Sequence, residues 1–502
     1  MDFCWRVVLG QVALVLALAR EASAQTPPVW SRDRGDTRVQ ELLDRLQRAA
    51  VQGLDSSDYG ISRLAALQTL RDNPSSAALF DSLATSAALR YMSDLAFGRV
   101  TPDLVDTLWT TTPRRVDFTD ALATALDSDR VGTTLDDLAP PQEAAVRLRM
   151  ALGQYRTIAA RNGWPELPAG PLLRVGAVHA HVPLLRRRLE IAGDLAPGGA
   201  GFIFDSALAA AVRRTQARHG LAPDGVVGPE TRANLNVSVL ERIRQIELNL
   251  ERWRWLPRDL GSRYLMVNSA GFTFELVDAG RALFSGRVVA GRVDWPTPIL
   301  SARLTEVTFS PRWNIPKSIA IQEVLPMVRR DPDHLRRDGI HVMSDTTEQA
   351  VELDLGTIAW DTVPDSTFAW RLWQESGPRN PLGRIRFTIP NRFGVALHDT
   401  REPQLFGALA RAFSHGCVRV ADAERLAIYV LREVPGWTPD SIRAAAALPA
   451  ERRVAAPDSM PTYLEYWTAW VGSDGVVEFR PDLYGWDAEL ADALSRRVRE
   501  PP

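Results

Sequence analysis

The 502-residue sequence has little cysteine, almost no net charge and, beyond its first residues, no long apolar run. Its 59 Lys and Arg nearly balance 61 Asp and Glu, so bulk charge gives no reason to expect nucleic acid or an anionic membrane as a partner. We find neither a Walker-type glycine loop nor a zinc ligand set, and therefore expect no nucleotide or metal cofactor. Because 45% of the residues are hydrophobic, the chain is long enough for two to four domains with substantial cores.

An apolar run at residues 7–19 follows a basic residue and precedes the small-x-small sequence 22–24, which is typical of a signal-peptidase site. We expect a signal peptide at residues 1–24 and export from the cytoplasm. An uncleaved membrane anchor is the alternative, but the run is short for a bilayer span of about 20 residues, which favours cleavage. Cleavage would remove Cys4 and leave Cys417 as a lone thiol in an oxidising compartment, where structural thiols usually pair. Its retention favours a reactive role.

The residues able to carry chemistry gather between positions 392 and 420. Cys417 follows His398 by nineteen positions and ends the sequence Ser414-His415-Gly416-Cys417. An unperturbed thiol, with a pKa of about 8.5, is mostly protonated at neutral pH and reacts well only as the thiolate. It therefore needs a base, and either histidine could take its proton. We expect the sulfur to be ionised beside an imidazole.

The sequence around this cysteine also predicts local structure. Residues 395–398 read as a strand that delivers His398 to an edge. Asp422 can cap a helix in which Leu426 and Val430 fall at helical spacing. The cysteine is then expected where a glycine-containing loop enters a helix, and free backbone N–H groups there could hold an oxyanion. A buried structural cysteine beside two core histidines is the alternative.

His398, followed by Ser414-His415-Gly416-Cys417 and an arginine two positions further on, resembles the signature of the L,D-transpeptidases, which cross-link bacterial peptidoglycan. The resemblance implies that Cys417 is the nucleophile and His398 its general base. It also implies supporting roles for neighbouring residues. These are the backbone carbonyl of Asp399, which would orient the imidazole, His415 as a second site residue near the oxyanion or substrate, Ser414 and Gly416 as support, and Arg419 as a brace for the loop.

The resemblance further implies a reaction. A peptidoglycan tetrapeptide would donate an acyl group to Cys417 with release of D-alanine, and the side-chain amine of a second stem peptide would accept it. Water as acceptor would make the protein an L,D-carboxypeptidase instead. Carbapenem-type inhibitors would acylate Cys417, other wall-synthesis enzymes are possible partners, and the location would be the periplasm or cell envelope.

Two other classes of function remain open. The chain could be a peptidoglycan-binding scaffold whose catalytic domain has lost its activity, although the intact residues around Cys417 argue against such a loss. It could also be an NlpC-like cysteine peptidase that cleaves wall peptides. In that class cysteine precedes histidine along the chain, whereas here His398 comes first.

The fold class we expect is multidomain α+β, with a helical N-terminal scaffold, a three-helix domain and a mostly β catalytic domain. Residues 25–174 carry apolar residues at helical spacing in 37–51, ending at Gly53, and again in 77–97. Parts of this region resemble the scaffold domain of the larger, YcbB-like members of the family. We find no catalytic constellation in it.

Residues 175–236 resemble the three-helix peptidoglycan-binding domain. Asp205 is placed to cap the second helix, Asp224-Gly225 to make a turn, and Pro229 to start the third helix. A generic helical linker is the alternative. His179 and His181 could suggest a metal pair, but no third ligand is near in the sequence, which favours a surface or packing role.

Residues 237–261 read as a connecting helix, and from 262 to 487 the apolar period changes to two, which predicts the β catalytic domain. Within it we expect a hairpin at 264–277, strands at 284–289 and 300–309, a capping insertion at about 315–378, and a loop with a short helix at 439–457. Residues 473–475 would turn between two strands that complete the domain, with a sugar-binding hairpin as the alternative, and 488–502 would be a tail. Candidate substrate contacts are Trp313, Asn314 and Trp373, and Gly383 permits close backbone approach.

Overall fold

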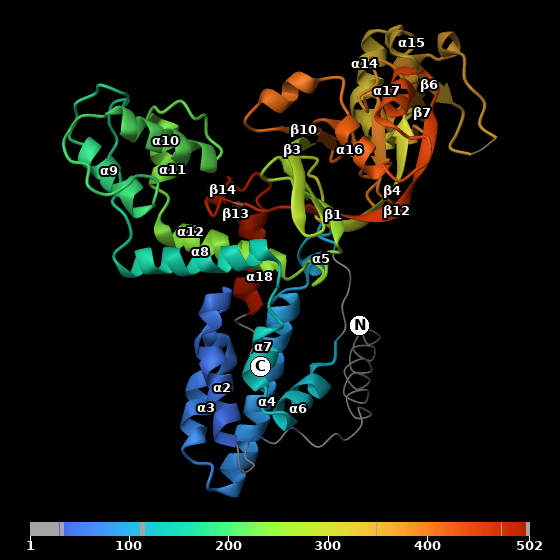
Figure 1. Ribbon diagram of the computed structural model, residues 1–502. Coiled ribbons are helices and arrows are strands. Elements are labelled where there is room, and N and C mark those ends of the chain that lie inside the picture. Colours follow the sequence, from blue (N-terminus) through green and yellow to red (C-terminus); the bar gives the residue numbers. More distant parts are fainter. Residues whose placement is uncertain (1–29, 31–34, 111–115, 348, 473, 498–502) are drawn as a thin grey trace, which may run out of the picture. The chain divides into compact units, whose positions relative to one another are not determined.

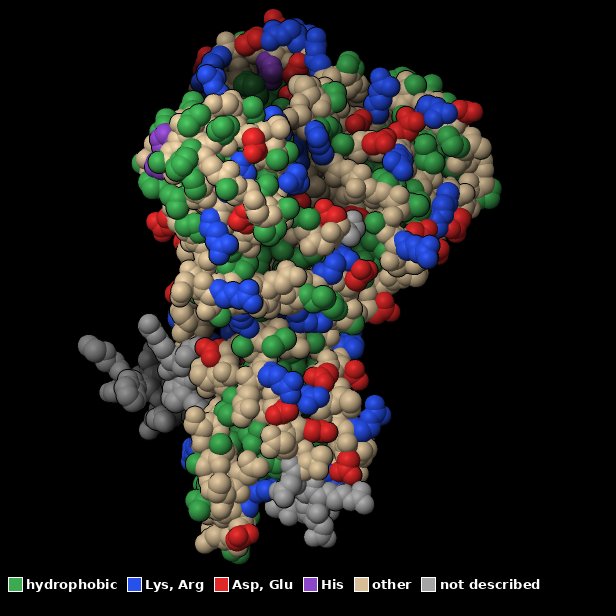
Figure 2. Space-filling view, turned by 60° about the vertical axis from the view of Figure 1, so that its left-hand side comes forward, with side chains coloured by type: hydrophobic (Ala, Val, Ile, Leu, Met, Phe, Trp, Pro, Cys, Tyr) green, Lys and Arg blue, Asp and Glu red, His purple; other side chains and the backbone are tan. Residues whose placement is uncertain are grey.

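The computed structural model describes residue 30 and residues 35–110, 116–347, 349–472 and 474–497. The predicted signal peptide, residues 1–24, lies outside this part of the chain. The described residues form two compact units, one of residues up to 99 with 114–141, the other of residues 100–113 with 142 onward. Within the described ranges no helix combines the length and apolar character needed to cross a membrane. On the face shown in Figure 2, acidic and basic side chains are interspersed, as the net charge of -2 leads one to expect.

The first unit is helical, as the spacing of its apolar residues predicts (Figure 1). Leu42, Leu43 and Leu46 are buried in its core. Gly53, with a φ of 75°, ends the 3-10 turn after the first helix. The elements are α2 (Gly35–Gln47), η1 (Ala49–Gln52), η2 (Ser56–Tyr59), α3 (Ile61–Gln68), α4 (Pro74–Phe97), α6 (Phe118–Asp127) and α7 (Val131–Asp136).

In the second unit, residues 175–236 form the predicted three-helix arrangement. The Asp205 carboxylate accepts the N–H of Leu208 at 2.8 Å and so caps the second helix. Pro229 is the first residue of the third helix, and Gly225 makes the preceding turn with a φ of 78°. The turn and capping predictions are confirmed here. The helices are α9 (Val182–Ile191), α10 (Ser206–Arg218) and α11 (Pro229–Leu235).

The connecting helix, α12 (Val239–Trp253), begins with a capping box. Ser238 Oγ accepts the N–H of Glu241 at 3.2 Å, and Glu241 Oε2 accepts the N–H of Ser238 at 2.8 Å. It shares a hydrophobic core with α8 (Glu143–Ala160). A short helix, α5 (Pro102–Val105), belongs to the same unit.

Two predictions near the C-terminus are wrong. The strands around 473–475, β13 (Ala469–Val471) and β14 (Val477–Phe479), form a sheet of their own instead of completing the β domain. Their apolar side chains fill the core between α8 and α12, which removes them from the larger sheet. The segment expected as a tail is largely helix α18 (Trp486–Arg497), because Leu490 and Leu494 are buried at helical spacing.

The β domain is a nine-stranded sheet in the order β10-β3-β11-β9-β8-β4-β12-β1-β2, and β2 also pairs with β3, so the sheet closes on itself. The first two strands form the predicted antiparallel hairpin. The strands are β1 (Arg263–Asn268), β2 (Thr273–Asp278), β3 (Arg281–Gly291), β4 (Leu300–Phe309), β8 (Ile385–Thr388), β9 (Leu397–His398), β10 (Ala412–Ser414), β11 (Val418–Val420) and β12 (Arg452–Glu465).

The beginning of β12 corrects a further prediction. Residues 452–455 lie in the segment 439–457, for which the alanine and arginine content predicted a loop with a short helix, yet they pair antiparallel with β4. The register of this pairing shifts between Ala455 and Met460. Pro457, which has no N–H to donate, falls within that irregular stretch, where a ladder hydrogen bond is not required.

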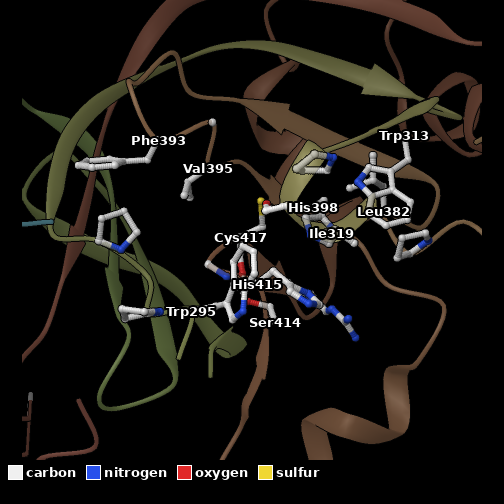
Figure 3. Close-up of a pocket in the computed structure, with 18 of the residues that line it drawn as sticks. Trp295, Trp313, Ile319, Leu382, Phe393, Val395, His398, Ser414, His415 and Cys417 are labelled. Carbon is white, nitrogen blue, oxygen red and sulfur yellow. Dashed lines mark hydrogen bonds between the residues drawn. The ribbon is translucent and has the colours of Figure 1, made fainter. Parts of the chain in front are cut away.

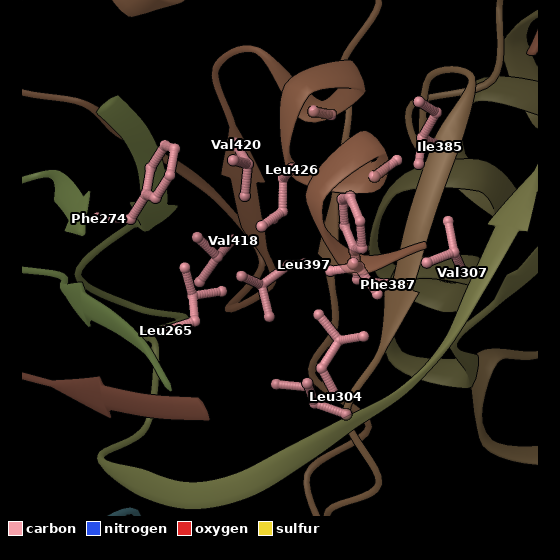
Figure 4. Packing of buried hydrophobic residues seen from close by; sticks show 14 of the residues in the cluster. Leu265, Phe274, Leu304, Val307, Ile385, Phe387, Leu397, Val418, Val420 and Leu426 are labelled. Atoms are coloured by element: carbon pink, nitrogen blue, oxygen red, sulfur yellow. The ribbon is translucent and has the colours of Figure 1, made fainter. Parts of the chain in front are cut away.

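The core of the β domain decides which side chains face the site. Leu397 of β9 and Val418 of β11 are fully buried and pack with Leu426 of helix α16 (Ala423–Val430) (Figure 4). Helix α17 (Pro439–Ala447) adds Ile442 to this cluster. Since strand side chains alternate between faces, the neighbours of Leu397 and Val418 must point away from the core.

The insertion (315–378) has a small hydrophobic core of its own, built around Val328, Leu335, Val342 and Leu372. A three-stranded sheet of order β5-β7-β6 supports it. The elements are β5 (Trp313–Ile315), α13 (Lys317–Ile319), the π-helical turn η3 (Ala320–Val324), α14 (Leu325–Arg330), α15 (His334–Asp338), β6 (Ile340–Met343), η4 (Leu355–Thr357), η5 (Trp360–Thr362), η6 (Asp365–Thr367) and β7 (Arg371–Gln374); η7 (Pro403–Gly407) follows outside it.

Candidate active site

The pairing of β9 with β11 brings His398 and Cys417 to one face of the sheet. The two strands run parallel, with Leu397 opposite Val418 and His398 opposite Arg419. Alternation then puts the side chains of His398, Cys417 and Arg419 on the face opposite the core. Figure 3 shows His398 and Cys417 next to each other at the pocket. The sequence predicted this pair, and the fold brings it together.

The imidazole of His398 is held by its own backbone neighbour. Nδ1 lies 2.6 Å from the carbonyl oxygen of Asp399, so Nδ1–H donates to that carbonyl and Nε2 is left as the basic nitrogen. Gly383, with a φ of 66°, allows the close approach predicted for it. A Cβ at this position would come within 2.6 Å of the Thr400 backbone nitrogen and of an Asp399 carboxylate oxygen.

Both members of the pair are shifted toward their neutral forms. Burial, reinforced by the positive charge of Arg419, lowers the pKa of His398 to about 4. Burial also raises the pKa of the Cys417 thiol, although the N–H of Ala396, 3.5 Å from Sγ, opposes this. At neutral pH the pair is therefore thiol and neutral imidazole, which corrects the expectation of an ionised sulfur.

The ring of His398 and Sγ of Cys417 are not hydrogen-bonded to each other among the described residues. Contacts of this kind often tighten only in the complex with substrate. The site is not sealed, because Cys417 lines an open pocket and keeps part of its surface exposed. The alternative of a fully buried structural cysteine is thereby disfavoured.

The loop before Cys417 is fixed by its backbone. Gly416 has a φ of 99°, a conformation that L side chains rarely adopt, and its carbonyl accepts the Thr297 hydroxyl at 2.9 Å. The Ser414 hydroxyl donates to the Cys417 carbonyl and accepts the N–H of Gly416 at 3.2 Å. In the described part of the chain the N–H of Cys417 itself has no acceptor. It is free to donate to an oxyanion.

One local prediction about this loop is wrong. Cys417 does not enter a helix directly, because strand β11 intervenes and α16 begins only at Ala423. Asp422 has a φ of 58° and makes no side-chain cap to the helix. Residues 418–420 form a strand instead of the start of a helix, because Val418 and Val420 are buried in β11 between β3 and β9. This burial outweighs the capping preference of Asp422.

A tyrosine supports the loop from behind. Tyr484 Oη donates to the carbonyl of Gly291 at 2.6 Å and accepts the N–H of Thr297 at 3.4 Å. Thr297 in turn holds Gly416. This hydrogen-bonded chain links Tyr484, two residues before helix α18, to Gly416, the residue just before the nucleophile.

The other predicted residues are distributed as follows. Arg419 donates to Glu402 Oε2 at 2.8 Å, and His415 Nε2 lies 2.6 Å from Glu323 Oε1. Trp313 lines the pocket. Asn314 is exposed and does not line it, and Trp373 stacks on His341, with ring centroids 4.0 Å apart, instead of facing the pocket.

The pocket around Cys417 has a volume of about 440 Å³ and a mainly apolar lining. In Figure 3, Trp313, Leu382 and Ile319 lie on one side of Cys417, and Trp295, Phe393 and Val395 lie on the other. No local sequence pattern indicated Leu382, Phe393 or Trp295, which reach the pocket only through the folding of the sheet and the insertion. A second arm of the pocket was therefore not predicted.

Among the described residues there is no group of three or more His, Cys, Asp or Glu side chains arranged to hold a metal ion. His179 and His181 do lie together, with ring centroids 4.3 Å apart in an edge-on arrangement. Within the described ranges no third ligand joins them, so the pair remains a surface feature of the three-helix segment.

Comparison with known families matches three stretches of the chain. Residues 22–152 match the family described as "Scaffold domain", residues 179–235 the "Putative peptidoglycan binding domain", and residues 262–442 the "L,D-transpeptidase catalytic domain". These matches and the structure confirm the predicted multidomain α+β class.

One curated relative is a "Putative L,D-transpeptidase" of Haemophilus influenzae, which is 29% identical over 249 residues. The match covers 49% of this chain and 49% of that protein, so the chain spans about half the length of its relative.

Solved structures also match. An L,D-transpeptidase from Xylanimonas cellulosilytica is 18% identical, with 60% of this chain and all of that chain covered, and the TM-score is 0.18. The structure titled "Structure of the Ldtfm-avibactam carbamoyl enzyme" is 12% identical over 41% of this chain and 49% of that chain, with a TM-score of 0.19.

Proposed function

Because this chain carries an L,D-transpeptidase catalytic domain together with a peptidoglycan-binding domain, we propose that it cross-links peptidoglycan by acyl transfer through Cys417. The observation that carries the proposal is the shared face of β9 and β11. There a thiol and an imidazole with its Nδ1 fixed by Asp399 line one pocket. This is the nucleophile-and-base arrangement of covalent catalysis, with a backbone carbonyl as the third group.

In the first half-reaction, Sγ of Cys417 attacks the carbonyl carbon between the L-configured diaminopimelate centre and the terminal D-alanine of a tetrapeptide stem. As the S–C bond forms, Nε2 of His398 takes the thiol proton. Because His398 is neutral at neutral pH, it is ready to accept that proton. The N–H of Cys417 donates to the oxyanion, and the proton then passes from His398 to the amine of the departing D-alanine.

In the second half-reaction, the side-chain amine of another stem peptide attacks the thioester. An amide bond forms, the C–S bond breaks, and the sulfur regains its proton from His398. Water in place of the amine would make the reaction an L,D-carboxypeptidase reaction. The apolar arm lined by Trp295 and Phe393 supports a peptide acceptor over water, because it offers surface to a second stem.

The remaining domains support the same substrate. The three-helix segment would hold the enzyme on the glycan–peptide network while the catalytic domain reacts, and the site of action would be the periplasm or cell envelope. Carbapenem-type inhibitors would acylate the same sulfur. A scaffold without turnover is the rival, and the free N–H of Cys417 beside an open pocket argues against it.

The test is Cys417→Ala in the purified mature protein, assayed with tetrapeptide-rich wall and mass spectrometry of the muropeptides. We expect the variant to lose all cross-linking, because the nucleophile is absent, while binding to sacculi stays at the wild-type level. Cross-links formed by the alanine variant would refute the assignment of the nucleophile. A wild-type protein that binds sacculi but leaves the muropeptides unchanged would favour the scaffold.

A further inference from the structure

A carboxylate of the insertion reaches the catalytic loop. Glu323 lies on the π-helical turn η3, and its Oε1 is 2.6 Å from Nε2 of His415, 92 positions further along the chain. The two side chains keep exposed fractions of 34% and 22%, so the contact borders the pocket without being buried. Turns of π-helix are rare and are found frequently at functional sites. The core and sheet pairings of the insertion do not require this bond.

The surroundings of this pair carry an excess of negative charge. Arg292 Nη2 lies 3.2 Å from Glu323 Oε1, and Arg292 Nε lies 3.1 Å from Asp294 Oδ1. The ring of Trp295 packs edge-on against His415, with centroids 5.1 Å apart. One guanidinium faces two carboxylates, so these three side chains together carry one negative charge in excess. An ammonium group that enters this arm of the pocket is attracted.

The two histidines near the sulfur have different hydrogen-bond partners. Nδ1 of His398 is engaged by the Asp399 carbonyl, and its other nitrogen serves the thiol. Nε2 of His415 is engaged by Glu323, and in the described part of the chain its Nδ1 has no partner. Toward His398 the charged neighbours are Arg419 and Arg386, whereas toward His415 they are Glu323, Arg292 and Asp294. The thiol side and the His415 side are thus electrostatically distinct.

An acceptor amine brings a chemical requirement that the first half-reaction lacks. A side-chain amine with a pKa of about 10.4 is an ammonium at neutral pH and has no lone pair with which to attack a thioester. In the proposed second half-reaction, His398 transfers one proton from the attacking amine to the sulfur. A second proton must leave the ammonium before attack. A base on the acceptor side of the sulfur meets this need.

Resting on the function proposed above, we propose that Glu323 is a positioning residue for the acceptor half-reaction, which fixes His415 so that its free Nδ1 takes a proton from the acceptor ammonium. The ammonium gives one proton to His415 Nδ1 and becomes a neutral amine, and His415 later returns that proton to solvent. The amine attacks the thioester, the N–C bond forms, its second proton passes through His398, and the C–S bond breaks to restore the thiol. Glu323 stabilises the imidazolium that forms in between.

The experiment separates the two half-reactions in the purified full-length protein. Acylation is followed as release of D-alanine from a disaccharide-tetrapeptide, and transfer as cross-linked product with a tripeptide stem that carries a free diaminopimelate amine. Hydroxylamine, which is unprotonated at neutral pH, serves as a second acceptor. The variants are Glu323→Gln, whose amide oxygen still accepts from Nε2–H, and Glu323→Ala, which removes the contact. Glu352→Gln is the matched control, because Glu352 makes a 2.6 Å bond to His341 of the same insertion, away from the pocket.

For Glu323→Ala we expect transfer to the stem amine to fall roughly 10- to 100-fold, with acylation and transfer to hydroxylamine within about twofold of wild type. Glu323→Gln should lose less, since it keeps the orientation but not the charge. Raising the pH toward about 10 should restore transfer in both variants, because the amine then loses its proton unaided. Glu352→Gln should match the wild type throughout.

Equal loss with both acceptors, or an equal loss of acylation, would overturn the proposal and reduce Glu323 to a structural contact. A control variant as impaired as Glu323→Ala would do the same. Failure of the function itself looks different, because the wild type would then release no D-alanine and the acceptor comparison would not arise.

Discussion

His398 and His415 flank the same sulfur but are held by different parts of the chain. The carbonyl of the next residue along the strand holds His398, and burial keeps its ring neutral. A carboxylate from an insertion holds His415, which stays partly exposed. The backbone hydrogen bond to His398 depends only on the sheet, whereas the side-chain hydrogen bond to His415 depends on the position of the insertion. The orientation of the first histidine is therefore set by the sheet, and that of the second by the insertion.

The sharpest way to test this contrast is to replace each ring in turn. We expect His398→Gln to lower the acylation rate by about 10³-fold or more, because the base that takes the thiol proton in the proposed reaction is then absent. His415→Gln should leave acylation within a few-fold of wild type. Intact-mass measurement of acylation by a carbapenem gives both rates. Equal losses for the two variants would erase the distinction between the histidines.

The acid side of the pH profile gives the next largest effect. Acylation needs neutral His398, and with a pKa of about 4 this form prevails at every pH well above 4. The rate should therefore stay level from neutral pH down to about 5 and fall as the pH passes through about 4. A histidine with an ordinary pKa of about 6.5 would already be failing near pH 6. D-alanine release between pH 3.5 and 8 distinguishes the two, provided that circular dichroism shows the fold intact at the acid end.

A smaller change is expected from Arg419→Gln. The positive charge of Arg419 contributes to the low pKa of His398, second to burial, so its removal should raise that pKa and move the acid limb to higher pH. Burial of His398 remains, so the pH at which the acylation rate falls should stay below that expected for a free histidine. Glu402→Gln, which removes the partner of Arg419 and keeps the guanidinium, is the companion variant. A limb that moves downward in Arg419→Gln would contradict this account.

The sequence was informative where local rules act alone. The alternation in residues 395–398 predicted a strand that delivers His398 to an edge, and β9 is that strand. The cap at Asp205 and the helix start at Pro229 likewise depend only on neighbouring residues. The assigned roles of Cys417 and His398 remain predictions until they are measured.

The sequence failed where distant segments decide. Nothing around Glu323 indicates that it meets a histidine 92 positions away, because the contact depends on how the insertion folds over the sheet. The neutral state of the thiol could not be predicted either, since burial is a property of the assembled pocket. Asp422 followed neither its capping preference nor the expected helix start, because the burial of β11 fixed the chain before it.

The hydrogen-bonded chain from Tyr484 through Thr297 to Gly416 makes the loop before Cys417 depend on a residue that comes much later in the sequence. A chain cut just before Tyr484 would keep Cys417, His398 and the strands that carry them, but it would lose the hydroxyl that bonds Gly291 and Thr297. The C-terminal segment therefore contributes to the geometry of the site without lining it.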